Sequence, residues 1–179
     1  MVIKNQVLDM TPIGMKFTVL RASADTGGES LDLHWELLPQ CNMKDALVHT
    51  HPNAIETYEV LEGDMEFFIK DKWFPATKGD KITVAKGVSH CFRNPTHKTV
   101  TVFNTHQPAL KMENYFEDAC TILDKLTNNR TQQFKMNMRA RLYMSVLMGN
   151  YRNDIIAKHP PDFAIKVLGA IGKLLKIKY

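Results

Sequence analysis

The sequence predicts a mainly β domain, folded as a sandwich or a barrel, that is followed by a helical segment. Over residues 1–106, about ten short stretches alternate apolar and polar side chains, and turn-forming residues separate them. That pattern is typical of all-β sandwiches and barrels. From about Pro108 onward the apolar residues recur at a spacing near 3.6, which indicates helices. We therefore expect a β domain over residues 1–107 and an extension of about three helices over residues 108–179.

The strands follow from runs with a period of two. They are predicted over residues 1–10, 15–21, 31–37, 56–62, 64–70, 72–75, 80–85, 90–93 and 99–106. In the run 31–37 the alternation places four large apolar residues on the inner face and His34 on the outer face.

Three helices are predicted beyond the β domain. Apolar spacing indicates helices around residues 112–126 and 134–147, and His159-Pro160-Pro161 separates them from a last helix over 162–176. One side of that last helix is apolar and lysines lie elsewhere, a pattern that suits a membrane surface or packing against protein. We expect it to pack on the parent fold or on a sister subunit. The apolar side consists of Phe163, Val167, Leu168, Ile171, Leu174 and Leu175.

Composition limits the classes of function. The net charge is only +4 and the basic residues are spread along the chain, so no nucleic-acid partner is expected. Three cysteines lie far apart with no Cys-x-x-Cys spacing, which favours reduced thiols and a cytoplasmic protein. The N-terminus has no long apolar run and no segment reaches transmembrane length, so a membrane partner is not expected.

Two histidines and a glutamate form the first chemical motif. His49 and His51 are separated by one residue, so on a strand their side chains point to the same face. Glu56 shares a face with Tyr58 and Val60, which places a carboxylate on an apolar side. A buried carboxylate needs a partner, and a metal ion held together with the two imidazoles would provide it.

A third imidazole comes from the segment between residues 79 and 94. Gly79 and Gly87 mark turns, and the strand between them places Ile82 and Val84 on one face. His90 and Phe92 then share a face of the next short strand. The chain thus offers three histidines and one glutamate on the inner faces of short strands.

These residues occur in a spacing that resembles a known family. The pattern His49-x-His51-x4-Glu56-x6-Gly63, followed by Gly79-x5-Ala85-x-Gly87-x2-His90-x3-Asn94, resembles the two signature motifs of the cupin superfamily. Ala85 stands where the family usually has proline, a change that removes no ligand. The resemblance implies a double-stranded β-helix, or jelly roll, and a small single-barrel cupin with a helical C-terminal extension, similar to quercetin-dioxygenase-like cupins. It also implies a homodimer.

The expected site holds one divalent transition metal ion, with His49, His51, Glu56 and His90 as ligands. Fe, Mn, Ni, Cu, Co and Zn all suit this ligand set. The pocket around the ion is expected to be largely apolar, with one phenol hydroxyl, and to accept a small-molecule ligand or substrate. Its lining is predicted to be Tyr58, Val60, Ile82, Val84 and Phe92.

The sequence is compatible with three functions, two of them enzymatic, and does not decide whether the protein is an enzyme. The first is a metal-dependent dioxygenase, an oxidoreductase that acts on a small oxygenated apolar or aromatic substrate, with Glu56 as the catalytic base. The second is a non-redox isomerase or lyase in which the metal polarises a carbonyl. The third is a small-ligand-binding protein without catalysis. His106, at the end of the last strand beside Pro108, could reach the pocket mouth, but it is interpreted as a surface histidine.

Overall fold

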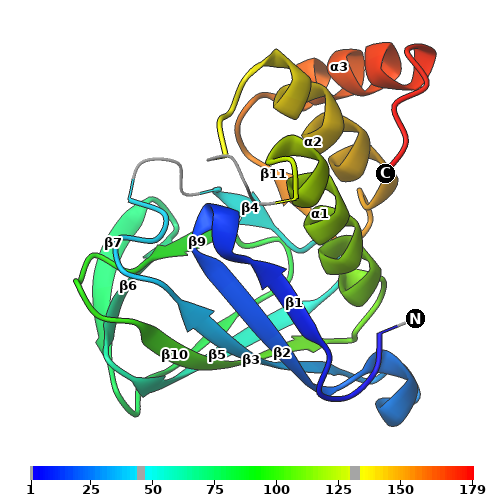
Figure 1. Ribbon diagram of the computed structural model, residues 1–179. Helices are drawn as coiled ribbons and strands as arrows, with labels where there is room; N and C mark the ends of the chain where they lie inside the picture. Colours follow the sequence, from blue (N-terminus) through cyan, green and yellow to red (C-terminus); the bar gives the residue numbers. More distant parts are fainter. Residues whose placement is uncertain (1, 44–46, 130–133) are drawn as a thin grey trace.

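The computed structural model describes residues 2–43, 47–129 and 134–179. Two antiparallel β-sheets face each other, and three helices lie at one end of the pair (Figure 1). The predicted mainly β fold with a helical C-terminal extension is confirmed. Residue 1, with which the first predicted strand begins, lies outside the described residues.

Each sheet combines strands that are distant in sequence. In spatial order, the six-stranded sheet contains β1 (Val7–Met10), β2 (Met15–Arg21), β3 (Leu31–Leu37), β10 (Val100–Gln107), β5 (Ile55–Glu62) and β8 (Lys81–Val84). The five-stranded sheet contains β11 (Ile156–Ala157), β4 (His49–Thr50), β9 (His90–Arg93), β6 (Asp64–Ile69) and β7 (Lys72–Thr77). The helices are α1 (Met112–Leu126), α2 (Met138–Asn150) and α3 (Asp162–Leu174).

Aromatic side chains from both sheets fill the space between them. Phe17 and Trp35 stack with their ring centroids 4.5 Å apart, and Tyr58 meets the edge of Trp35 at 5.5 Å. Phe67 of the opposite sheet lies 4.9 Å from Tyr58. The two sheets are therefore joined by an apolar core that reaches up to the strands carrying the histidines.

The extension contributes a strand as well as helices. In β11, Ile156 lies opposite Thr50 and Ala157 lies opposite His49, so this strand extends the five-stranded sheet at β4. The sequence gives no sign of it, because two residues are too few to show a period.

Helix α3 packs on α2 through its small residues. Gly169 and Gly172 are buried, and a Cβ atom at Gly172 would lie 2.6 Å from Cγ2 of Val146. The apolar side that was expected to pack on the parent fold instead faces away from it, since Phe163 is 71% and Leu174 is 82% exposed. Packing of this side on the parent fold is therefore contradicted for these residues, while packing on a sister subunit stays a prediction. Among the described residues, no helix is both long and apolar enough to cross a lipid bilayer.

Gly63, which ends the first motif, should tolerate no side chain. Its φ is +86°, and a Cβ atom there would lie 3.1 Å from Cγ2 of Val100. Gly79 has φ +92° but open space around its Cα. We expect Gly63→Ala to lower the free energy of unfolding by about 2–3 kcal/mol and Gly79→Ala by about 1–2 kcal/mol, measured by urea unfolding. Equal losses in the two variants would show that the contact with Val100 has no effect.

Candidate metal centre

The four expected ligands meet between the two sheets. His49 of β4 lies directly opposite His90 of β9, and His51 follows β4 by one residue. Glu56 comes from β5 in the other sheet. All four side chains are buried, and one ligand atom from each lies within 4.8 Å of the other three. The structure therefore brings together His49, His51, Glu56 and His90, as a metal ligand set requires.

Backbone carbonyl groups orient the three imidazoles. Nδ1 of His49 lies 2.8 Å from the Leu47 oxygen, and Nδ1 of His90 lies 2.9 Å from the Val88 oxygen. Nδ1 of His51 lies 2.7 Å from the carbonyl oxygen of Asp154. A carbonyl oxygen only accepts hydrogen bonds, so each Nδ1 carries the proton and donates it. In a neutral ring, Nε2 is then left with a lone pair for a metal, which is the usual second-sphere arrangement of histidine ligands.

The donor set fits a cation. Oε2 of Glu56 lies 2.8 Å from Nε2 of His90 and 3.0 Å from Nε2 of His51. With Nδ1 protonated in both neutral rings, all three of these atoms are acceptors and repel one another. A positive charge must lie among them, either as protons on the imidazoles or as a bound metal ion. A borderline divalent metal ion matches the three nitrogens and one carboxylate oxygen.

Burial and mutual charge shift the titration of the cluster. Burial raises the pKa of Glu56, but the charges and hydrogen bonds of His106 and His51 outweigh it and hold this pKa well below its usual value. Burial lowers the pKa of His51, yet the Glu56 charge more than compensates and raises it above 6.5. Burial holds the pKa of His49 well below 6.5. Glu56 is therefore ionised and His49 is neutral at physiological pH.

His106 belongs to this cluster, and its interpretation as a surface histidine is wrong. It is 1% exposed, and its Nε2 lies 3.2 Å from Oε1 of Glu56, directly across the β10–β5 pair. Asn104, two residues earlier on the same face, donates to the same oxygen at 2.9 Å. The signal was present in the sequence, because His106 continues the inward alternation of Val100, Val102 and Asn104. The nearby Pro108 instead suggested that the strand ends at the surface, which led to the wrong interpretation.

His106 holds Glu56 in place and differs from the three candidate ligands. Within the described part of the chain, its Nδ1 has no hydrogen-bond partner. No carbonyl group therefore fixes the proton on Nδ1, as it does in the three candidate ligands. The neutral ring can instead donate Nε2–H to Oε1. One oxygen of Glu56 is thus held by His106 and Asn104, while the other faces His51 and His90.

The C-terminal extension completes the centre. The carbonyl oxygen that accepts from His51 belongs to Asp154, which lies between α2 and β11. The Asp154 side chain is itself held, because Oδ1 accepts from the Lys111 backbone N–H at 2.7 Å. Lys158 N–H donates to the Val48 oxygen at 2.8 Å, beside His49. Residues from the extension therefore support both histidines of the first motif.

The residues predicted to line a pocket lie on the inner face beside Glu56. Val84 is opposite Glu56 and Ile82 is opposite Tyr58 across the β5–β8 pair. Tyr58 is fully buried, with its ring 6.3 Å from that of His90 and 6.0 Å from that of Phe92. Burial, and then the charge of Glu56, raise the pKa of Tyr58 well above its usual value. Val60 is also buried, whereas Ile82 is partly exposed. These five residues are thus apolar apart from one neutral phenol, and their role in substrate binding remains a prediction.

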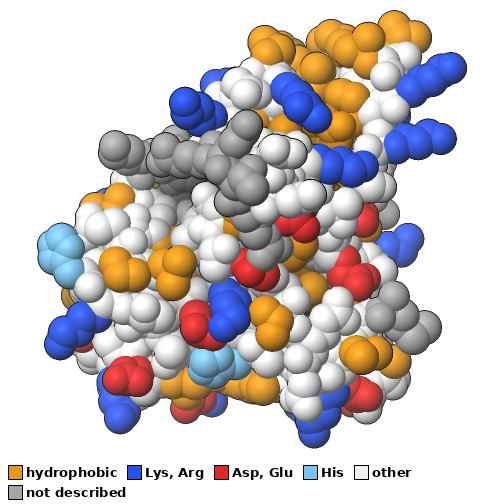
Figure 2. All heavy atoms as spheres, in the orientation of Figure 1, with side chains coloured by type: hydrophobic (Ala, Val, Ile, Leu, Met, Phe, Trp, Pro, Cys, Tyr) orange, Lys and Arg blue, Asp and Glu red, His pale blue; other side chains and the backbone are white. Residues whose placement is uncertain are grey.

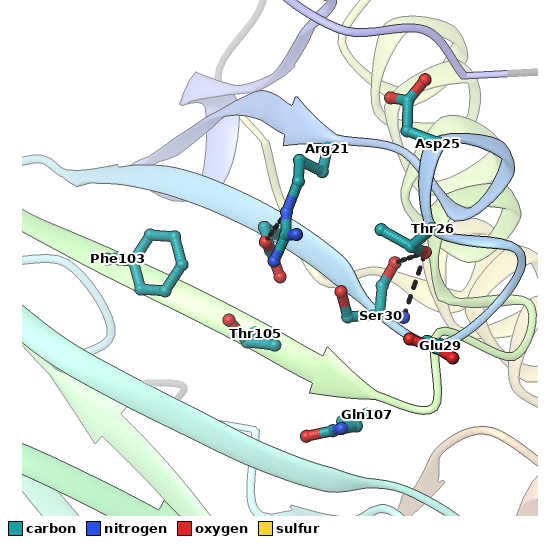
Figure 3. A pocket seen from close by; sticks show the side chains of 9 residues that line it. Arg21, Asp25, Thr26, Glu29, Ser30, Phe103, Thr105 and Gln107 are labelled. Atoms are coloured by element: carbon teal, nitrogen blue, oxygen red, sulfur yellow. Dashed lines mark hydrogen bonds and ion pairs between the residues drawn. The ribbon is translucent and has the colours of Figure 1, made fainter.

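A separate polar hollow of about 550 Å³ lies on the outer face of the six-stranded sheet (Figure 3). Arg21 crosses it and pairs with the buried Asp32, Nε to Oδ2 at 2.5 Å. Thr105 lines this hollow, while the next residue, His106, points to Glu56. Because consecutive residues of a strand point to opposite faces, the sheet itself separates the hollow from the candidate metal centre.

Removing a ligand should abolish tight metal binding. We expect wild-type protein to bind one divalent transition metal ion per chain, and His90→Ala or Glu56→Gln to weaken binding by more than about 100-fold, because each removes one of four donors. The measurement is a competition titration with a chromophoric chelator, together with elemental analysis. His97→Ala, at an exposed histidine, is the control and should bind like wild type. Unchanged affinity in both ligand variants would exclude this site.

The extension should affect metal affinity through Asp154. Asp154→Ala removes the acceptor that holds the backbone at Lys111, so the carbonyl group facing His51 loses its support. We expect metal affinity to fall by about tenfold, the usual lower bound for loss of a second-sphere contact. Asp71→Ala is the control, because Asp71 is exposed and pairs with Lys158 beside β11. Equal affinity of the two variants would show that the extension does not position His51.

Metal affinity should fall as the pH falls. Protons compete with the metal for Nε2, and the raised pKa of His51 means that this competition begins above pH 6.5. Below the pKa of His51 the affinity should drop by at least roughly tenfold per pH unit, because metal binding must displace the proton on His51. His49 adds nothing in this range, because its pKa is well below 6.5. Affinities measured from acidic to neutral pH should show the slope, and a flat profile would contradict it.

Comparison with known proteins agrees with the fold and the motifs. Residues 34–106, which include all four candidate ligands, match the family model described as the cupin domain. Among solved structures, an RmlC-like cupin from Shewanella frigidimarina is 20% identical with a TM-score of 0.52, over 61% of this chain and 88% of that chain. KdgF from Halomonas sp. is 11% identical with a TM-score of 0.51, over 60% of this chain and 92% of that chain.

At these identities the solved structures support the fold alone. The search of curated proteins found no match to the chain. The family match nevertheless covers both histidine motifs, and the two facing sheets have the architecture that those motifs imply. Residues 34–106 of the chain therefore form a cupin domain.

Proposed function

We propose that this protein is a mononuclear metal-dependent dioxygenase of the quercetin-dioxygenase-like type, acting on a small oxygenated apolar or aromatic substrate. The observation that carries the proposal is the orientation of three imidazoles by three carbonyl groups, so that their Nε2 atoms and Oε2 of Glu56 face one another in apolar surroundings. The arrangement is built for a cation. Apolar residues around the site favour an apolar substrate over a sugar phosphate.

His49, His51, Glu56 and His90 would hold the ion. When bound, a redox-active ion such as Fe, Mn, Ni or Cu supplies Lewis acidity and electron exchange with dioxygen. With four protein ligands, a bound ion would keep coordination positions free for a small-molecule substrate.

Glu56 is the group that can move a proton. It is ionised, and its second oxygen is held by Asn104 and His106. As a base, Glu56 would give up its place as a ligand and take up a proton from a substrate hydroxyl at Oε2, while His106 and Asn104 hold Oε1 and keep the carboxyl group in place. Tyr58 stays protonated because its pKa is raised, so it acts as a neutral polar contact.

A non-redox isomerase or lyase is the second candidate, and the pairing of Glu56 with His106 favours it. A carboxylate that is hydrogen-bonded to a buried imidazole can take a proton from the carbon beside a carbonyl and return it elsewhere. Such a reaction needs a metal only to polarise the carbonyl, so zinc would be sufficient.

Metal content and oxygen uptake test the proposal. Protein purified without added metal should contain iron, manganese, nickel or copper near one ion per chain. Metal-free protein reloaded with each ion should then be screened against enediols and flavonols, with oxygen consumption as the readout. We expect one metal form to consume oxygen in step with substrate loss, His97→Ala to retain this activity and Glu56→Gln to lose it.

Two other outcomes would replace the dioxygenase proposal. A zinc-containing protein that isomerises or cleaves keto compounds without oxygen would support the second candidate. Binding of these compounds without turnover in any metal form would indicate a small-ligand-binding cupin.

A further inference from the structure

Helix α3 turns its least bulky side toward the protein. Ile165, Gly169 and Gly172 are its buried residues. A Cβ atom at Gly169 would lie 3.2 Å from the carbonyl oxygen of Ser145 in α2, so the glycines allow the two helices to approach closely. Phe163, Val167 and Leu174, by contrast, stay exposed.

The opposite side of α3 is apolar and exposed. At about 100° per residue, Phe163, Val167 and Leu174 project roughly opposite to Gly172 and Ile165. A surface helix of a globular protein normally has the reverse arrangement, with its polar side outward. We call this surface the outer α3 face, and its members and exposures are Phe163 71%, Val167 55%, Ile171 41%, Leu174 82% and Leu175 62%.

Positive charge surrounds the outer α3 face. Over residues 162–179 the sequence has four lysines and one acidic side chain, Asp162. That carboxylate already pairs with Arg152 and, at 2.9 Å, with Lys166. Figure 2 shows hydrophobic side chains gathered at the end of the molecule where Figure 1 places α3, with Lys and Arg side chains around them. The surface thus combines exposed apolar side chains with a net positive charge, because one acidic side chain accompanies four lysines.

We propose that the outer α3 face binds an anionic membrane surface, with α3 lying in the plane of the interface. An exposed Phe, Val and Leu face flanked by lysines is the chemistry of helices that insert their apolar side at the boundary of headgroups and acyl chains. The 13 residues of α3 make it about 20 Å long, which suits lying on a bilayer and is too short to cross it. Anionic headgroups would meet the lysines.

The charges argue against the other occupants of such a face. If two copies met through the outer α3 face, lysines would approach lysines, and the only acidic side chain of the segment is already paired. A nucleic acid would satisfy the lysines and leave five large apolar side chains without an apolar partner. A lipid interface with anionic headgroups offers apolar depth and negative charge together.

The position of α3 leaves it accessible to a flat surface. In Figure 1, α3 lies at the extremity of the molecule, beyond α2 and away from both sheets. A bilayer contacting the outer α3 face would therefore not collide with the described parts of the β domain.

Vesicle flotation with the full chain tests this proposal. Protein is mixed with vesicles of phosphatidylcholine alone, or of phosphatidylcholine with phosphatidylglycerol, and the bound fraction is converted to a partition coefficient. We expect binding to the anionic vesicles that weakens with added salt, and much weaker binding to neutral vesicles. Phe163→Asp with Leu174→Asp should abolish binding. Lys173→Glu with Lys176→Glu should weaken it by roughly fivefold or more per lysine.

Matched control variants distinguish binding through the outer α3 face from nonspecific binding to vesicles. Ile3→Asp with Val7→Asp replaces exposed apolar residues at the other end of the chain, and Lys78→Glu with Lys86→Glu replaces exposed lysines in the β domain. Both controls should bind vesicles like wild type. All replaced side chains are largely exposed, so circular dichroism should confirm that each variant is folded.

Three results would overturn the proposal. The first is absence of flotation with anionic vesicles. The second is equal loss of binding in the control variants. The third is a wild-type protein that does not bind vesicles and forms a dimer, seen by light scattering, that Phe163→Asp with Leu174→Asp disrupts. That result would assign the outer α3 face to a second copy of the chain. Metal content and oxygen uptake are independent of these readouts.

Discussion

The buried carboxylate of Glu56 is the constraint on which the rest of this structure depends. A lone carboxylate in this apolar space would be strongly destabilising, because its hydration is lost and nothing replaces it. Here each oxygen has its own partners. Oε2 faces His51 and His90 from the side of the five-stranded sheet, while Oε1 faces His106 and Asn104 of β10 in its own sheet. The carboxylate thus links the two sheets next to the aromatic core.

This constraint explains why the helical extension is tied so closely to the β domain. His51 must present Nε2 to Glu56, so its Nδ1 needs an acceptor, and that acceptor comes from Asp154. β11 then pairs with β4 and adds backbone hydrogen bonds beside His49. The cupin domain and the extension are therefore one structural unit at the candidate metal centre, although they differ in secondary structure and in sequence pattern.

The chemical features of the molecule lie in three places. The candidate metal centre lies between the sheets, the polar hollow around Arg21 and Asp32 lies on the outer face of one sheet, and the outer α3 face lies at the far end of the extension. Two glycines of α3 let this helix approach α2 closely while Phe163, Val167 and Leu174 stay exposed. Small residues at the helix contact thus leave the bulky ones for a different partner.

The sequence by itself determined the β domain, the three helices and the four residues that meet at the centre. The period of two places His49 and His51 on one face, and Glu56, Tyr58 and Val60 on another, whatever the rest of the chain does. Local alternation is sufficient for this, because a strand with one buried face must present its apolar side inward.

Tertiary structure alone decided the partners of those residues. That His106 lies opposite Glu56 depends on the register of β10 against β5, between residues that are far apart in sequence. The acceptor for His51 comes from a residue about a hundred positions away, in a connection with no periodic pattern. The outward direction of Phe163 and Leu174 was set by which side of α3 could approach α2 most closely, a choice that packing makes and a helical period cannot.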